Sequence, residues 1–133
     1  MDHDERSTVE GILRQRRQAI VQAWYQAISP TAYQPGGTAK VRARLGTLVD
    51  QATEFLLDET PGSAMAEALG GALTTVDTLQ PEAFGRSLEM LACGMLAGLP
   101  AEQTLRLQPR LARLLGGMGT GHERVARDRQ GLA

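Results

Sequence analysis

Cysteine, histidine and aromatic residues are scarce in this chain of 133 residues, which contains one Cys, two His, one Trp, two Tyr and two Phe. A single Cys excludes an internal disulfide and fits a reducing compartment, so we expect a cytoplasmic protein. The first residues are acidic and polar, unlike those of a signal peptide. The charge-free stretch at residues 90–101 is too short to cross a bilayer, so we expect no membrane partner.

An excess of charge of either sign is also absent, because 14 Lys and Arg stand against 15 Asp and Glu and the net charge is −1. This balance gives no general attraction to nucleic acid or to an anionic membrane. The arginines nevertheless gather in two groups, Arg14, Arg16 and Arg17, and then Arg106, Arg110, Arg113, Arg124, Arg127 and Arg129. No aromatic residues are interleaved with them, so we interpret both groups as solvated helix faces and expect no nucleic-acid partner.

What the chain has in quantity is apolar residues at the helical period, and no segment alternates long enough to predict a strand. We therefore predict a single all-α domain over residues 1–133, with five to six helices in a globin-like stack or a helical bundle. The first helix is expected to begin at Ser7, where Ser7 and Glu10 have the spacing of a capping box, and to end at Pro30. Its predicted core residues are Ile12, Leu13, Ile20, Ala23, Trp24, Ala27 and Ile28.

A second helix is predicted over residues 38–59, where the apolar stripe is the most regular in the chain. The stripe consists of Val41, Leu45, Leu48, Val49, Ala52, Phe55 and Leu56. Basic residues stand near the N-terminus of this helix and acidic residues near its C-terminus, which opposes the helix macrodipole. They are Lys40, Arg42 and Arg44, and then Asp50, Glu54, Asp58 and Glu59. Such an order suggests antiparallel pairing with another helix, within the chain or across a dimer, and we favour salt bridges within the chain.

Prolines punctuate the remaining helices. We predict helices from Ser63, from Pro81 and from about Leu99, and we expect Pro109 to end the last of these and to start a sixth. The helix from Ser63 carries little charge, so it is expected to be well buried. The apolar residues of these helices are Met65, Ala68, Leu69, Ala72, Leu73 and Val76, then Phe84, Leu88, Leu91, Ala92, Met95 and Leu96, then Leu111, Leu114, Leu115 and Met118. Four glycines follow, so residues 122–133 are expected either to fray or to form a truncated linker helix.

Residues that carry catalysis or metal binding are not grouped in the sequence. Neither His3 nor His122 has an acidic residue three positions earlier, which the Glu-x-x-His pairs of a di-iron bundle require. Cys93 lies in an apolar run, where a Cys usually packs as a small core residue. The glycine run 116–121 follows a helical pattern instead of a strand, and it lacks the Lys of a phosphate loop. We therefore expect no enzyme and no metal ion.

The few aromatic and methionine side chains have two interpretations. Packing in the core is the usual role of such residues. The alternative is a small apolar pocket within the helical stack. For that alternative, the candidate ligand-binding residues are Trp24, Phe84 and Met95.

Several local strings together resemble N-terminal helical regions of bacterial signalling proteins. Ile12-Leu13 with the arginines that follow and Trp24, together with residues 41–56, resemble the opening of the N-terminal domain of RsbR-type stressosome co-antagonists. Residues 79–86 and 99–101 resemble segments of N-terminal helical regions of sensor histidine kinases and related PAS-containing regulators. The resemblance spans most of the chain and rests on helix openings and apolar spacing, with no catalytic motif.

This resemblance implies a non-enzymatic sensory or dimerisation input domain in bacterial signal transduction. Such a domain passes a helix rearrangement, caused by a ligand or a partner, to a downstream PAS, STAS or kinase domain. It implies a homodimer and a fold similar to that of globins without haem. Haem needs a proximal His on a central helix, and His3 and His122 are badly placed for that role, so we expect no cofactor. The alternative function is a stand-alone helical bundle that binds a small molecule.

Overall fold

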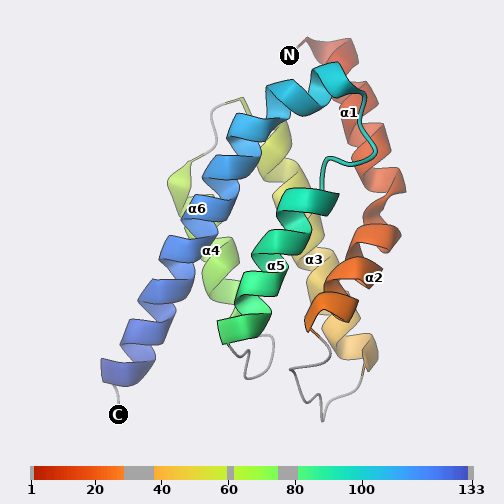
Figure 1. The fold of residues 1–133 in the computed structure, drawn as a ribbon. Coiled ribbons are helices and arrows are strands. Elements are labelled where there is room, and N and C mark those ends of the chain that lie inside the picture. Colours follow the sequence, from red (N-terminus) through yellow and green to blue (C-terminus); the bar gives the residue numbers. More distant parts are fainter. Residues whose placement is uncertain (1, 29–37, 60–61, 75–80, 132–133) are drawn as a thin grey trace.

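The computed structural model describes residues 2–28, 38–59, 62–74 and 81–131, which form six α-helices and contain no strand (Figure 1). The helices are α1 (His3–Gln15), α2 (Arg17–Ile28), α3 (Thr38–Leu57), α4 (Ser63–Leu73), α5 (Pro81–Gly94) and α6 (Ala101–Gly131). The prediction of an all-α fold with five to six helices is therefore confirmed. The predicted end of the first helix at Pro30 and the core position Val76 lie outside the described residues.

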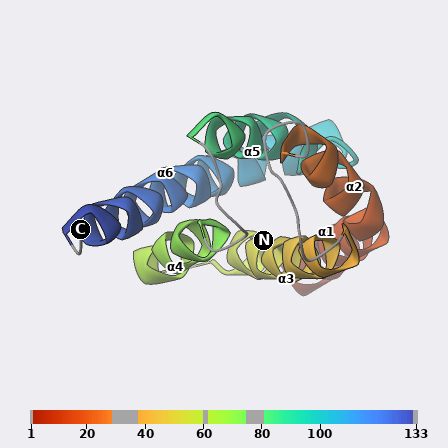
Figure 2. The same cartoon turned by 90° about the horizontal axis from the view of Figure 1, so that it is seen from below.

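Five of the helices follow one another in a ring around the core, as the end-on view of Figure 2 shows. Going round this ring, α2 packs on α3, α3 on α4, α4 on α6, α6 on α5, and α5 again on α2. The remaining helix, α1, lies against α3. The ring encloses one hydrophobic cluster, so each helix needs a single apolar face directed towards its centre.

The beginning of the chain differs from the prediction in two respects. The first helix begins at His3 and not at Ser7, because the Asp2 carboxylate accepts the N–H of Glu5 at 2.7 Å and so caps it. Acidic residues in the first turn, Asp4 and Glu5, further favour this start. The helix is also interrupted at Arg16, where φ is −89° and ψ is 0°, so that the predicted single helix is two helices.

The end of the chain is one continuous helix, so the prediction that Pro109 ends one helix and starts another is wrong. Pro109 lies on an exposed face of α6, and Leu105, whose carbonyl loses its partner there, has a side chain 69% exposed. Water can hydrate that carbonyl, so the proline costs less than it would in a buried helix. Residues beyond the glycines also remain helical as far as Gly131, so they do not fray.

The core follows the predicted stripes most closely in α3, where all seven predicted residues are buried. Elsewhere the buried faces are narrower than predicted: Ala23, Ala68 and Ala92 are exposed. The prediction that Cys93 packs in the core is also wrong, because its side chain is exposed next to Ala92 on the outer face of α5. The expectation of a well-buried α4 holds for one face, which consists of Ala66, Leu69, Gly70 and Leu73.

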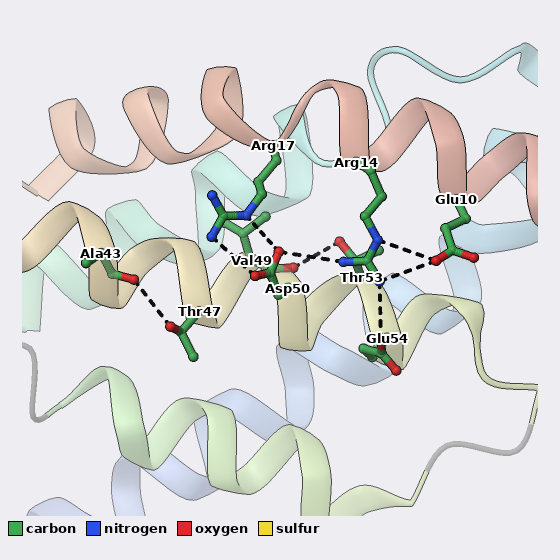
Figure 3. Close-up of polar contacts among 9 residues, drawn as sticks. All are labelled: Glu10, Arg14, Arg17, Ala43, Thr47, Val49, Asp50, Thr53 and Glu54. Carbon is green, nitrogen blue, oxygen red and sulfur yellow. Dashed lines mark hydrogen bonds and ion pairs between the residues drawn. The ribbon is translucent and has the colours of Figure 1, made fainter.

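Arginine–carboxylate contacts join α1 and α2, which together are called the α1–α2 arm, to α3 (Figure 3). Arg17 Nε donates to Asp50 Oδ1 at 2.8 Å, and Arg14 Nη2 to Glu54 Oε1 at 3.2 Å. Farther along, the guanidinium of Arg42 on α3 lies 4.9 Å from the ring centroid of Tyr25 on α2. The order of these contacts shows that α3 runs antiparallel to the arm. The acidic residues Asp50 and Glu54 of α3 are therefore paired within the chain, as we favoured, and the basic Arg42 lies over an aromatic ring.

Two further arginines satisfy carbonyl groups at the ends of other helices. Arg16 Nη1 donates to Gly94 O at 3.0 Å, at the C-terminus of α5. Arg110 Nη1 donates to Leu56 O at 2.8 Å, at the C-terminus of α3. Because the last carbonyls of a helix lack partners within it, these side chains act as caps from a distance. We interpreted both arginine groups as solvated helix faces. That interpretation is wrong for Arg16 and Arg110, and for the arginines that form ion pairs with another helix.

The contact between α4 and α6 is made by glycines on both helices. A Cβ at Gly70 would overlap the backbone of Met118, and a Cβ at Gly121 would overlap the backbone of Glu67. Next to these points, a Cβ at Gly117 would overlap the side chain of Ala66. The two helices run in the same direction, as Figure 1 shows, and approach to backbone contact. Two glycines of the run, Gly117 and Gly121, are thus closely packed against α4.

Candidate functional site

The three candidate ligand-binding residues all belong to the one hydrophobic cluster, but they differ in access. Trp24 is fully buried, and its Nε1 donates to Ser87 Oγ at 2.8 Å. Ser87 Oγ in turn donates to Ala83 O at 3.0 Å, so both polar groups in this part of the core are satisfied. Met95 is also fully buried. Phe84 is 8% exposed and lines a hollow at the surface, which makes it the predicted residue with a place in a candidate site.

The hollow lies between α5 and α6 and has a volume of about 510 Å³. Phe84 contributes from α5, and five residues contribute from α6. Those five are Gly116, Gly119, Thr120, His122 and Glu123. Its size suits a small molecule or a few side chains of a partner.

An aromatic pair forms one wall of this hollow. The rings of Phe84 and His122 are stacked, with centroids 3.8 Å apart and planes 7° apart. Burial lowers the pKa of His122 below its ordinary value, although the nearby carboxylate of Glu123 acts in the opposite direction. The imidazole is therefore neutral at neutral pH, when one ring nitrogen can donate a hydrogen bond and the other can accept one.

The Nδ1 atom of His122 is buried and has no hydrogen-bond partner among the described residues. A buried polar atom without a partner costs free energy, so a group that bonded to this nitrogen would be bound favourably. Sequence reasoning missed His122 as a site residue because it considered only metal and haem. The signal was weak, since the stacking joins two residues from helices that are distant in the sequence.

The floor of the hollow consists of glycine backbone. A Cβ at Gly116 or at Gly119 would meet nothing within 4 Å, in contrast to the glycines that face α4. These two glycines therefore lower the helix propensity of α6 without allowing any close packing inside the chain. What they provide is an uncovered helix surface that another molecule can approach. Next to them, Thr120 Oγ1 donates to Gly116 O at 3.3 Å and keeps an acceptor lone pair.

Over residues 2–28, 38–59, 62–74 and 81–131, no three His, Cys, Asp or Glu side chains are grouped so as to hold a metal ion. None of the helices in those ranges has the length and apolar character needed to cross a membrane.

Comparisons with known proteins add no further assignment to this geometry. No protein-family model matches the chain, and no match of significance was found among the curated proteins or the solved structures.

Proposed function

We propose that this chain is a non-enzymatic input domain of a cytoplasmic signalling protein, which works as a homodimer coupled to a downstream output domain. A small molecule or a partner segment binds in the hollow between α5 and α6. Its binding changes the packing of α6, and that helix passes the change on.

The observation that carries this proposal is the position of the hollow on α6. The helix is continuous from Ala101 to Gly131, and it packs against α3, α4 and α5. A ligand that separated Phe84 from His122 would act directly on the junction between α5 and α6. Since α6 is joined to α4 by backbone contact, a displacement of α6 would move the two helices together.

The first experiment is native mass spectrometry of the protein purified from its own host. We expect a stoichiometric additional mass on each chain. Gly119→Leu should abolish this mass, because the added side chain fills the hollow without meeting any atom near its Cβ. Gly11→Leu is the matched control, since its Cβ on α1 also meets nothing within 4 Å and lies far from the hollow in sequence. A chain without added mass, or a mass unaffected by Gly119→Leu, would contradict the proposal.

The second experiment follows α6 itself. Cys93 is the single Cys of the chain and is exposed on α5, so it accepts a spin label directly. With a second label at Arg127→Cys, the distance between α5 and α6 can be measured before and after the bound mass is removed. We expect a change of about 1–2 Å or more, as is usual for helix shifts.

The second candidate function is a stand-alone bundle that binds a small molecule, and it is favoured by the same hollow. The two functions differ in what α6 does. If the mass is bound but the distance between the two labels stays constant, the stand-alone binding function is supported and the relay is refuted.

A further inference from the structure

A line of exposed polar residues runs along α3 beside its buried stripe and ends at Asp58, the residue that follows the helix. Its members are Lys40, Arg44, Thr47, Gln51, Glu54 and Asp58. Successive members are separated by alternating steps of four and three residues, which is the spacing of a coiled-coil seam. Such a line keeps to one side of a helix over its whole length, so a second helix could follow it from end to end.

The charges along this line form a self-complementary pattern. The first two members are basic, the middle two are neutral, and the last two are acidic. In an antiparallel pair of α3 helices from two copies, one register places every basic member opposite an acidic one. That register pairs Lys40 with Asp58 and Arg44 with Glu54, and it pairs Thr47 with Gln51 at the centre. All three pairs follow from a single two-fold axis, as an isologous dimer requires.

A shallow hollow lies at the acidic end of this line. It has a volume of about 470 Å³, and it is lined by the carboxylates of Asp2, Glu54, Asp58 and Glu59 together with His3 and Arg6. The long basic side chains of the second copy could therefore enter this hollow, where carboxylates outnumber basic groups.

The contacts within the chain are compatible with this arrangement. Glu54 accepts Arg14 on Oε1, its side chain remains 61% exposed, and its second oxygen can accept another donor. Arg44 and Asp58 also have contacts within the chain, so the pairs across the axis would add to these contacts or exchange with them. Asp50, which is paired with Arg17, lies beside the line and not on it.

We infer that two copies of this chain associate through α3, antiparallel and about a two-fold axis that passes between Thr47 and Gln51, with Lys40 and Arg44 of each copy facing Asp58 and Glu54 of the other. This inference deepens the dimer included in the proposed function by naming its surface. The interface is polar, so its dissociation constant should rise with ionic strength. At 0.1 M salt, exposed charges more than about 10 Å apart are largely screened from one another.

The test uses two variants of the full chain in analytical ultracentrifugation. The double variant Lys40→Glu with Arg44→Glu makes every charged member of the line acidic, and Glu54→Lys with Asp58→Lys makes every charged member basic. We expect the wild type to dimerise at about 0.05 M salt and to dissociate at about 0.5 M. We expect each variant alone to show a dissociation constant at least about tenfold higher. An equimolar mixture should form a heterodimer, since every pair across the axis is then of opposite charge.

Control variants separate the effect of this surface on dimerisation from the effects of net charge and of misfolding. Arg113→Glu with Arg129→Glu, and Glu89→Lys with Asp128→Lys, make the same changes of charge at exposed positions of α5 and α6. They should leave the wild-type dimer intact. Circular dichroism checks that each variant is helical, and a variant that does not fold is replaced by the single changes Lys40→Glu and Asp58→Lys.

The inference is overturned if the wild type stays monomeric at low salt, if the α3 variants dimerise like the wild type, or if the mixture fails to associate. Its failure is distinguishable from failure of the relay. The bound mass and the movement of α6 are measured at the other face of the molecule, on variants that leave α3 unchanged.

Discussion

The helix pair α4–α6 and the pair formed by the α1–α2 arm with α3 are held together differently. In the first, backbones touch because glycines remove the side chains between them, and one ion pair, between Arg124 and Glu67, lies beside this contact. In the second, long arginines reach across to carboxylates, and the paired groups remain about 40% exposed. A contact between backbones has little room to adjust, whereas a solvated ion pair can shift or be replaced by water. The stability of the α4–α6 contact therefore depends mainly on how closely the two backbones fit. The ion pairs between the arm and α3 change the stability of that contact only slightly.

The sharpest way to break this comparison is to make the same substitution on two faces of α6. Gly121→Ala places a Cβ against the backbone of Glu67, so we expect a loss of unfolding free energy of about 2 kcal/mol or more. Gly116→Ala meets nothing and raises helix propensity, so we expect a gain of up to about 1 kcal/mol. Urea denaturation of both variants measures the difference. Equal effects of the two substitutions would show that the close approach of α4 to α6 has no energetic importance.

A smaller effect is expected from Arg16→Met, which keeps an apolar stem but removes the guanidinium. The carbonyls of Gly94 and Met95 then lose their partner, and the unfolding free energy should fall by about 1–2 kcal/mol. Arg113→Met on an exposed face of α6 should change it by less than about 0.5 kcal/mol. Thermal denaturation of both variants is sufficient, and a stable Arg16→Met would remove the capping role.

A still smaller loss of unfolding free energy is expected from Arg17→Met. The hydrogen bond to Asp50 raises the pKa of Arg17 above its ordinary value, but both side chains are about 40% exposed. Solvent screening limits such a pair, so we expect a loss of about 0.5 kcal/mol that disappears in high salt. A loss as large as that of Gly121→Ala, measured in the same urea series, would overturn the distinction between shape and charge.

The smallest effect concerns pH and His122. Burial lowers the pKa of His122 below its ordinary value near 6.5, so the unfolded chain takes up a proton at a higher pH than the folded one. Stability is therefore complete above about pH 6.5 and should decrease as the pH falls from there to the folded pKa. His122→Phe keeps the stacking on Phe84 and should flatten this part of the curve of stability against pH. If wild type and variant have parallel curves, His122 does not contribute.

The sequence predicted the features that depend on the spacing of apolar residues. It missed those that depend on which helices come close together. The α3 stripe repeats every three to four residues and faces the core at every member, so its burial could be predicted. The wrong start at Ser7 arose because a capping box and an Asp N-cap are both valid local signals, and here the Asp2 cap with an acidic first turn begins the helix earlier. Pro109 was read as a break because the sequence does not show that its face of α6 meets water.

Only one residue of the candidate site could be predicted from the sequence. Phe84 was named because aromatic and methionine side chains can line an apolar pocket, but Trp24 and Met95 were named on the same ground and lie deep in the core. The other members of the hollow are ordinary residues in sequence. The glycines at 116 and 119 look like those at 117 and 121, and only the position of α4 shows which pair is covered.

The ring of helices has a consequence for synthesis of the chain. A ribosome makes the helices in order, so α1 to α5 emerge while the place of α6, between α4 and α5, is still vacant. Until then the apolar faces of those helices have no cover on that side, and Gly70 has no backbone to contact. The nascent protein can therefore complete its core only when α6 has left the exit tunnel, and chaperones that recognise apolar surface would act before that moment.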